Sequence, residues 1–541
     1  MTLADIADDL LGLTVEWDPF LCSAVGIPDA AGLVPDLSDD GQARLRDGFA
    51  SASRELQRID PASLSSEDRL TWQMATWQSR LWTSIVDSRR EEFTVSPYKA
   101  WSLPTAITSV MPKALSDPDA FHSRCASLAG ALGQAQDALR RGAARGRTPV
   151  RRLVEGVTAL LDDLFAAGGP EKTLEGNGTA ETREVLASSV RPALGEFREF
   201  LATELAPLAR PDDRPGLCWI PGGEEAYQAS VAEHTTTSLT PAEVHELGRE
   251  TVAALASEAR PLAQAVFGTE DLAEVVTRLR DDPALRFDSP AELLAAAVES
   301  FHRGQSVVDS FIGTLPVTRC EVKPMPDLEA ARMMQAYYRP GDSTVDRPGI
   351  FWVNTNISRG ATRYELETLV AHESVPGHHV QWSMAREVPH CRYRSLVPTT
   401  AFIEGWALYC EQEADELGLF TSDLSRLGKW SSQSWRAARL VVDTGLHAMG
   451  WTRAQAVEYL LTHTATSPAN AEGEVDRYIG NPGQALAYTT GVLELRRLRQ
   501  EAESRMGARF DRREFHDRLL AHGSPPLPLV RTAIEEWMGT A

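Results

Sequence analysis

The chain is poor in cysteine and has no long apolar run free of charge. Its six cysteines are scattered and form no C-x-x-C pair, which argues against a disulfide framework or a thiolate zinc site and is typical of a reducing compartment. No uncharged apolar stretch reaches the roughly 18 residues that a membrane-spanning helix needs, so we expect no transmembrane segment.

Basic residues are also scarce relative to acidic ones. Lysine and arginine total 54 against 76 aspartates and glutamates, which gives a formal net charge of -22. Nucleic acids and anionic membranes are therefore unsuitable partners. The excess of acid serves solubility, or it marks a cleft that prefers basic peptides. The first residues lack the basic and apolar segments of a secretory signal, and we expect a cytoplasmic protein.

The 541 residues, 43% of them hydrophobic and 24% charged, have an ordinary globular composition and can bury a large core. Apolar residues recur every three or four positions through most of the chain, which predicts a mainly α fold. Thr240 and Ser289 each precede a proline and then an acid, an order typical of helix N-termini. The predicted helices cover residues 41–58, 66–85, 118–144, 149–165, 181–206, 241–264, 289–312, 452–464 and 485–506.

Strand signals are sparse, so only a small β-sheet is expected. Residues 348–355 combine aromatic and β-branched side chains after Pro-Gly, and a weaker signal lies near 317–322. The strand at 348–355 is either an ordinary buried strand or an exposed edge that binds a peptide backbone, with Asn354 near its end.

Two segments rich in proline and glycine interrupt the helical pattern, at residues 166–180 and 207–223. We therefore predict an N-terminal helical lobe over residues 1–210 and a catalytic portion over residues 211–541.

The strongest chemical signal is a cluster of three histidines and a glutamate within eight residues: His372-Glu373-Ser374-Val375-Pro376-Gly377-His378-His379. In an H-E-x-x-H helix the two histidines lie one turn apart and the glutamate faces the metal's water. Here Pro376 takes the place of the second histidine. His378 comes six residues after His372, about 240° around a regular helix, and His379 lies on the same face but ~10 Å further along.

Pro376 and Gly377 suggest how the spacing is accommodated. Proline removes a helical hydrogen bond, and glycine frees the backbone to recover. If the chain bulges outward at 375–377, His378 takes the position of the second ligand. We therefore predict His372 and His378 as zinc ligands, with His379 as the alternative. Histidines that only pack or cap the helix are the simpler reading.

A carboxylate in an apolar helix supplies the third predicted ligand. Glu404 lies in Phe402-Ile403-Glu404-Gly405-Trp406, in a helix predicted to start at Thr399 or Thr400. A carboxylate among such neighbours needs a cation or a donor, unless it is only an acid stabilised at a helix start. Glu411, two turns further on, either orients a ligand histidine or is a solvated surface acid.

The chain resembles the bacterial "domain of unknown function 885" family, which is regarded as a family of zinc metallopeptidases, over nearly its whole length. The resemblance is carried by the His372–His379 cluster, by Phe402–Tyr409, and by Arg477-Tyr478-Ile479-x-x-Pro482-Gly483-Gln484-Ala485-x-x-Tyr488. At one remove the layout is similar to helix-rich gluzincins of the thimet oligopeptidase and angiotensin-converting enzyme type. The two extra residues before His378 are a departure from their motif.

The resemblance implies a metallopeptidase-like fold with its small sheet beside the active-site helix, and one zinc ion per chain. Glu373 would act as general base. Tyr488 would donate to the developing oxyanion, with Tyr478 as a competing donor. His447 lies one turn after Asp443, and the two would form an oriented imidazole near the metal or an ordinary core pair.

These observations predict a zinc-dependent hydrolase that cleaves a peptide or amide bond. Two other readings remain open: a biosynthetic metalloenzyme that acts on a small-molecule amide or another non-peptide bond, and a non-catalytic helical binding protein.

Overall fold

Side-chain caps begin many of the helices in the computed structural model, which describes residues 1–24, 27–98, 103, 117–172, 179–326, 330, 335–356, 361–387, 393–394, 397 and 399–540. Thr240 caps its helix through a reciprocal pair of hydrogen bonds with Glu243, and Ser289 accepts from the backbone N–H of Glu292. Both predicted starts are confirmed, and so is the mainly α fold with a small sheet. Among the described helices, none has the length and apolar character that crossing a bilayer requires.

Contacts divide the chain into two compact units. Unit 1 comprises Met1–Ala232, Asp443–Ala456 and Glu472–Gly483, and unit 2 comprises the remaining segments, Glu233–Val442, Val457–Ala471 and Gln484–Ala541. Unit 1 thus extends beyond the predicted boundary at residue 210 and includes two later segments. Composition could not reveal this division, because four helices (Gly223–Thr235, Asp423–His447, Arg453–His463 and Pro468–Gly480) belong partly to one unit and partly to the other.

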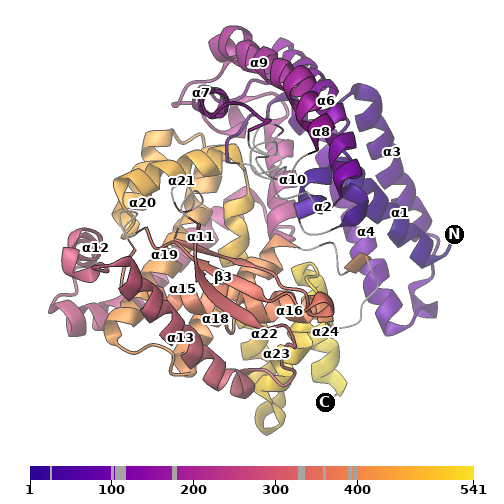
Figure 1. Cartoon of the computed structure of the whole chain (residues 1–541). Coiled ribbons are helices and arrows are strands. Elements are labelled where there is room, and N and C mark those ends of the chain that lie inside the picture. The colour runs from indigo at the N-terminus through magenta and orange to yellow at the C-terminus, as the bar shows by residue number, and fades with distance from the viewer. Residues whose placement is uncertain are drawn as a thin grey trace. The chain divides into compact units, whose positions relative to one another are not determined.

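All but one of the described helices of unit 1 come from the first 235 residues of the chain (Figure 1). They are α1 (Leu3–Trp17), α2 (Pro19–Ala24), α3 (Asp39–Leu56), α4 (Ser66–Asp87), α6 (Pro118–Ala144), α7 (Arg151–Ala166), α8 (Ala180–Val185), α9 (Arg191–Phe200), α10 (Gly223–Thr235) and α21 (Pro468–Gly480). The helix predicted over 181–206 is α8 and α9 with π-helical turns at Leu186–Val190 and Leu201–Leu205. Its apolar face joins those of α6 and α7 in one core.

Unit 2 contains the longer series of elements. Its helices are α11 (Pro241–Phe267), α12 (Leu272–Asp281), α13 (Pro290–Phe311), α15 (Leu366–Glu373), α16 (His378–Glu387), α18 (Thr400–Glu416), α19 (Asp423–His447), α20 (Arg453–His463), α22 (Ala487–Met506), α23 (Arg512–Leu520) and α24 (Leu527–Thr540). Its strands are β1 (Cys320–Pro324), β2 (Ala336–Arg339) and β3 (Gly349–Val353).

The sheet has the order β1-β3-β2, with β1 parallel and β2 antiparallel to β3. The predicted strand at 348–355 is therefore the central strand, and its interpretation as an exposed edge was wrong. Asn354, after its end, is buried and donates to the Ala330 carbonyl. The edge strand β2 was missed because four residues are too few for a periodic signal.

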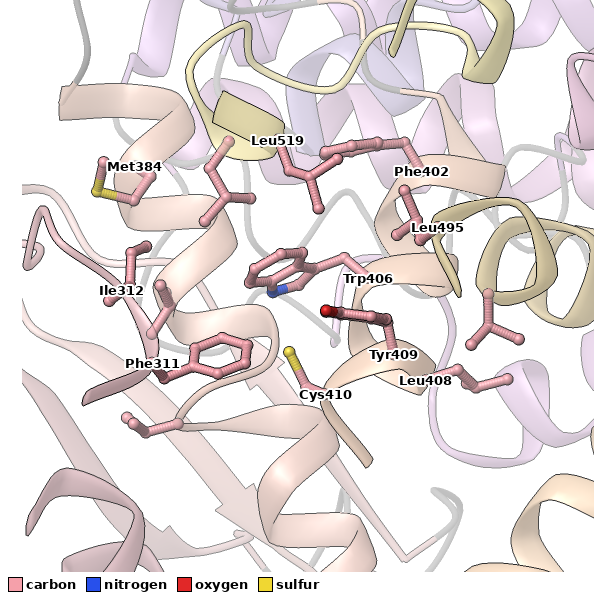
Figure 2. Close-up of a cluster of buried hydrophobic side chains, with 14 of the residues drawn as sticks. Phe311, Ile312, Met384, Phe402, Trp406, Leu408, Tyr409, Cys410, Leu495 and Leu519 are labelled. Carbon is pink, nitrogen blue, oxygen red and sulfur yellow. The ribbon is translucent and has the colours of Figure 1, made fainter. Parts of the chain in front are cut away.

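The core of unit 2 surrounds Trp406, which is fully buried (Figure 2). Phe311, Leu495 and Leu519 come to it from three other helices of the same cluster. Helix α18 lies closely against α22, because a Cβ on Gly405 would be only 2.6 Å from the Gly491 Cα and glycine at both positions removes that conflict. This close packing against α22 fixes the position of helix α18, which carries Glu404.

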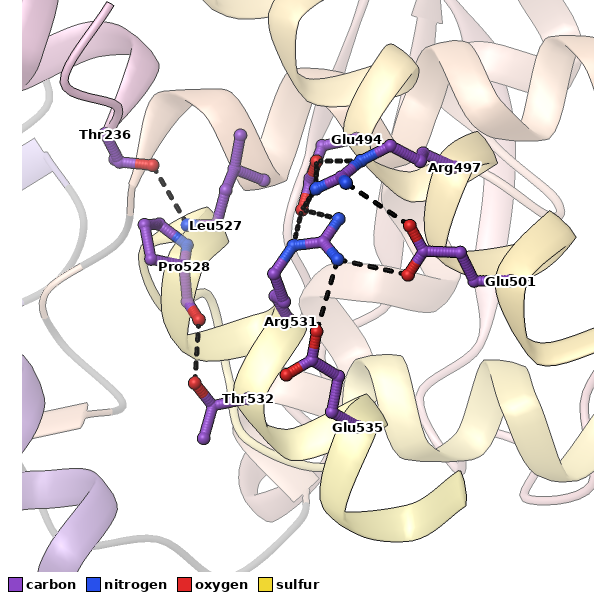
Figure 3. A network of polar contacts seen from close by, with 9 residues as sticks. All are labelled: Thr236, Glu494, Arg497, Glu501, Leu527, Pro528, Arg531, Thr532 and Glu535. Carbon is purple, nitrogen blue, oxygen red and sulfur yellow. Dashed lines mark hydrogen bonds and ion pairs between the residues drawn. The ribbon is translucent and has the colours of Figure 1, made fainter. Parts of the chain in front are cut away.

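Charged side chains tie α22 to α24 at the surface of this core (Figure 3). The guanidinium of Arg531 donates to Glu494 at 2.8 Å, to Glu501 at 3.1 Å and to Glu535 at 3.3 Å. One arginine shared by three carboxylates fixes the last helix of the chain on α22.

Candidate metal centre

A turn at Val375–Gly377, which contains a cis peptide bond before Pro376, separates α15 from α16. Helix α15 ends at Glu373, and His378 begins α16. Gly377 is required here, since a Cβ would lie 1.9 Å from the carbonyl oxygen of His372. The predicted outward bulge between the two histidines is present in this form.

Buried donors on α18 hold this turn. The indole Nε1 of Trp406 lies 3.3 Å from the carbonyl oxygens of both Pro376 and Gly377, and the thiol of Cys410 donates to Pro376 at 3.4 Å. Figure 2 shows both groups on the side of α18 that faces α15 and α16. The carbonyl oxygens of the turn between the two helices thereby have hydrogen-bond donors from the protein itself.

The turn brings His372 and His378 together with Glu404. The Nε2 atom of each histidine lies 3.6 Å from Oε2 of Glu404, and the two imidazole rings meet nearly at right angles, at 83°. The three ligand atoms lie within 4.8 Å of one another. The sequence-predicted ligand set therefore converges on one point within unit 2.

The electrostatics of the three groups reflect this proximity. Burial alone would lower the pKa of His372, but hydrogen bonds to Glu404 and Glu411 raise the pKa to about 9. Burial alone would raise the pKa of Glu404, whereas the two histidines hold it well below its usual range. The carboxylate is thus kept ionised and the imidazoles turn their Nε2 atoms toward it.

Both histidines have a partner at the other ring nitrogen. The Nδ1 atom of His372 lies 2.8 Å from Oε1 of Glu411, which is fully buried. The Nδ1 atom of His378 lies 3.4 Å from Oε1 of Gln381. The Nε2 group of Gln381 donates to the Phe402 carbonyl. Acceptors at Nδ1 leave Nε2 free to coordinate, as in most histidine metal sites. Glu411 is therefore no surface acid.

Glu373 points toward the sheet instead of joining the three ligands. Its Oε2 accepts the backbone N–H of Tyr338 in the edge strand β2, at 3.0 Å. The hydroxyl of Tyr338 also lies 2.9 Å from Nδ1 of His379, whose pKa burial lowers to about 4. Tyr338 of strand β2 thus contacts both His379, through its hydroxyl, and Glu373, through its backbone N–H. His379 is engaged there, and His378 is the histidine that lies beside His372.

The two tyrosines considered as donors belong to different units. Tyr488 lies in unit 2 and is half-buried. Its ring lies 4.7 Å from the guanidinium of Arg439, and Gln484 Nε2 donates to its hydroxyl at 3.5 Å. Tyr478 is buried in unit 1. Of the two, only Tyr488 shares a unit with the three ligands.

His447 does not form the predicted pair with Asp443. It is fully buried in unit 1, where Nδ1 accepts the N–H of Leu217 at 3.2 Å and Nε2 donates to the Tyr478 carbonyl at 3.1 Å. Asp443 instead accepts from the Tyr227 hydroxyl at 2.6 Å and from the Gly483 N–H at 3.0 Å. Since backbone groups occupy both ring nitrogens, the predicted catalytic role of His447 has no support in these contacts.

The donor set suits zinc. Two imidazole nitrogens and a carboxylate oxygen are among its preferred ligands, and ligand atoms on a tetrahedral zinc ion lie roughly 3.3–3.6 Å apart. The two separations between a histidine Nε2 and Oε2 of Glu404, both 3.6 Å, need little adjustment. Among the described residues the cluster offers three protein ligands, and a site with three protein ligands and an open fourth position is typical of catalytic zinc.

Sequence reasoning missed Gln381 and Tyr338. Gln381 had a weak signal, because it follows His378 by three residues in α16 and so lies on the same helical face. Tyr338 had none, since strand pairing alone brings it to Glu373.

The structure is similar to that of "the putative lipoprotein from Colwellia psychrerythraea", with a TM-score of 0.87 and 23% identity over 100% of this chain and 99% of that one. It is also similar to "a putative lipoprotein of unknown function from Shewanella oneidensis", with a TM-score of 0.77 and 17% identity over 99% and 100%. At these identities the likeness shows the fold alone. No curated protein matches the chain.

A family match covers most of the sequence. The family described as "Bacterial protein of unknown function (DUF885)" matches residues 19–534, which include every residue of the candidate metal centre. The chain therefore belongs to the bacterial DUF885 family.

Proposed function

We propose that this protein is a zinc-dependent hydrolase that cleaves a peptide or amide bond. One observation carries the proposal: two histidine Nε2 atoms and a glutamate oxygen converge within 4.8 Å, and the next residue after the first histidine is a glutamate that is not part of this set. A structural metal site would use four protein ligands, whereas this set offers three.

His372, His378 and Glu404 would hold the ion. Zinc, when bound, would act as a Lewis acid on the scissile carbonyl and make a water more acidic. Glu373 would take the proton of the attacking water and pass it to the leaving amine. The Tyr338 N–H, by holding Oε2 of Glu373 at 3.0 Å, would leave Oε1 for the water.

Tyr488 is the proposed donor to the oxyanion that develops on the carbonyl. Its place in unit 2 and its half-buried side chain support this role, and the guanidinium of Arg439 against its ring restricts its movement. Tyr488→Phe would therefore lower kcat more than it raises KM, because the donor acts on charge that appears in the transition state.

The first test is metal analysis of the purified chain, for which we expect about one zinc per chain. The second compares Glu373→Gln with Glu367→Gln, a matched change on the same helix, where Glu367 accepts from Thr421 and pairs with Arg303. Glu373→Gln should retain zinc but lose roughly 10²–10⁴-fold in turnover of a peptide library. Glu367→Gln should retain both.

Two results would contradict the proposal. Normal turnover in Glu373→Gln would remove the assigned base. A chain that takes up no zinc would leave a helical binding protein. Turnover of small amides without any of peptides would instead narrow the substrate to a small-molecule amide, as expected of a biosynthetic enzyme.

A further inference from the structure

His372 is held between two carboxylates of one helix. Glu404 and Glu411 are seven residues apart on α18, so they lie on the same face about 10 Å from each other. The imidazole of His372 fits between them, with Nε2 3.6 Å from Glu404 and Nδ1 2.8 Å from Glu411. The direction of the ring therefore depends on where Glu411 is held.

Glu411 cannot rely on water. Its side chain is fully buried, and a buried carboxylate is costly unless charge and hydrogen bonds compensate it. A single N–H from His372 reaches only one of its two oxygens. A second group must supply the opposite charge and prevent the carboxylate from turning.

Helix α19 supplies that group. Arg436 places Nη2 3.5 Å from Oε1 of Glu411, the oxygen that also meets His372. Ser432, one turn earlier, donates its hydroxyl to the other oxygen, Oε2, at 3.4 Å. Arg436 in turn donates to the hydroxyl and the carbonyl of Ser432. Both oxygens of Glu411 are thus held from α19.

Arg436 is itself fixed in this place. It is only 9% exposed, and its guanidinium lies 5.7 Å from the ring of Trp435. An arginine buried this deeply loses its hydration, which is offset only if its charge meets a carboxylate in good geometry.

We propose that Arg436 is a positioning residue for the metal centre, acting on His372 through Glu411. This inference rests on the proposed zinc site. Arg436 holds the Glu411 carboxylate, the carboxylate holds Nδ1–H of His372, and the ring is thereby aimed with Nε2 toward Glu404 and His378. A metal ligand aimed in advance binds more tightly, because less freedom is lost on coordination.

The test measures zinc affinity by competition with a chromophoric chelator, and it needs no substrate. Loss of a residue behind a ligand histidine typically weakens metal binding 10–100-fold. We expect Glu411→Gln to fall in that range and Arg436→Gln to weaken zinc binding about tenfold. The double variant should bind like Glu411→Gln alone, within about threefold, because both changes break one chain of contacts.

A geometric readout separates positioning from general damage. Co²⁺ bound in place of zinc should absorb differently in Arg436→Gln, since its spectrum follows the ligand geometry. Arg436→Lys keeps the charge but not the planar fork, and should restore part of the affinity. It also serves as the test if Arg436→Gln does not fold.

A matched control is the ion pair of Glu413, which lies on the same helix as Glu411. Arg499 of α22 is paired with Glu413, which is buried two residues after Glu411 but contacts neither histidine ligand. Arg499→Gln should lower the stability and leave zinc affinity within about twofold, because that pair is a structural one.

Two outcomes would overturn the inference alone. In both, the wild type binds zinc: either Arg436→Gln and Arg436→Lys bind it equally well, or the effects of Glu411→Gln and Arg436→Gln simply add. A wild type that takes up no zinc would overturn the proposed function and this inference with it.

Discussion

Gly377→Ala should disrupt the turn between the two histidine ligands. The added Cβ would lie 1.9 Å from the carbonyl oxygen of His372 and 2.4 Å from that of Ala371, where contacts below 3.0 Å essentially never occur. Both neighbours are backbone atoms, so no side chain can rotate away. The backbone must move by about 1 Å, and His378 is the next residue along the chain.

Two effects of different size follow from this movement. Overpacking of a buried turn lowers the free energy of unfolding by about 1–3 kcal/mol. Zinc tolerates ligand distances only within about 0.2 Å, so a shift of about 1 Å in His378 should weaken zinc binding by at least tenfold.

Urea denaturation followed by circular dichroism measures the first effect, without metal, and chelator competition measures the second. Gly133→Ala is the control, because nothing lies within 4 Å of its added Cβ in α6. It should stabilise the chain by about 0.5–1 kcal/mol and leave zinc binding unchanged. A Gly377→Ala protein with wild-type stability and wild-type zinc affinity would refute the assigned turn.

Two further predictions concern stability. Burial raises the pKa of Asp443 to about 7 from the usual 3.8. Between pH 3.8 and pH 7 the folded chain therefore keeps a proton on this carboxyl that the unfolded chain has lost. The free energy of unfolding falls as the pH rises through this range. Asp443→Asn keeps the acceptor oxygen without ionising and should gain a few kcal/mol over the wild type between pH 4 and pH 8; parallel urea-denaturation profiles would contradict this. Arg531→Met should lower the free energy of unfolding by about 1–3 kcal/mol, because Glu494 and Glu501 lose one of the two arginines that they share, Arg497 being the other (Figure 3). A change below about 0.5 kcal/mol would show that the contacts of Arg531 contribute nothing.

Local signals in the sequence are sufficient for many of the longer helices. The spacing of apolar residues and the caps at Thr240 and Ser289 place α11 and α13 within a few residues of their bounds. The same reasoning fails for β2, whose four residues become a strand only by pairing with β3. It also offers no signal for the division into two units, because α10, α19, α20 and α21 each belong partly to both.

The ligand set of the candidate metal centre could be predicted from the residue types and from the effect of Pro376-Gly377 on the helix. Pro376 cannot continue the helix, and Gly377 allows the chain to turn, so His378 is free to leave the regular spacing. The choice between His378 and His379 needed the tertiary structure, since Tyr338 of β2 takes His379 and leaves His378 beside Glu404.

What the sequence alone determined is therefore the helical architecture and the chemical groups that a zinc ion would use, because helix periodicity and metal-ligand chemistry are short-range. Only the tertiary structure decided which groups meet. The sequence allows Glu411 to be a surface acid, but in the structure it is buried beside Arg436 of α19. The sequence also allows His447 to pair with Asp443, but in the structure both of its ring nitrogens contact backbone groups, of Leu217 and Tyr478. Such contacts join residues far apart in the chain, and their partners are set by packing and not by spacing along the sequence.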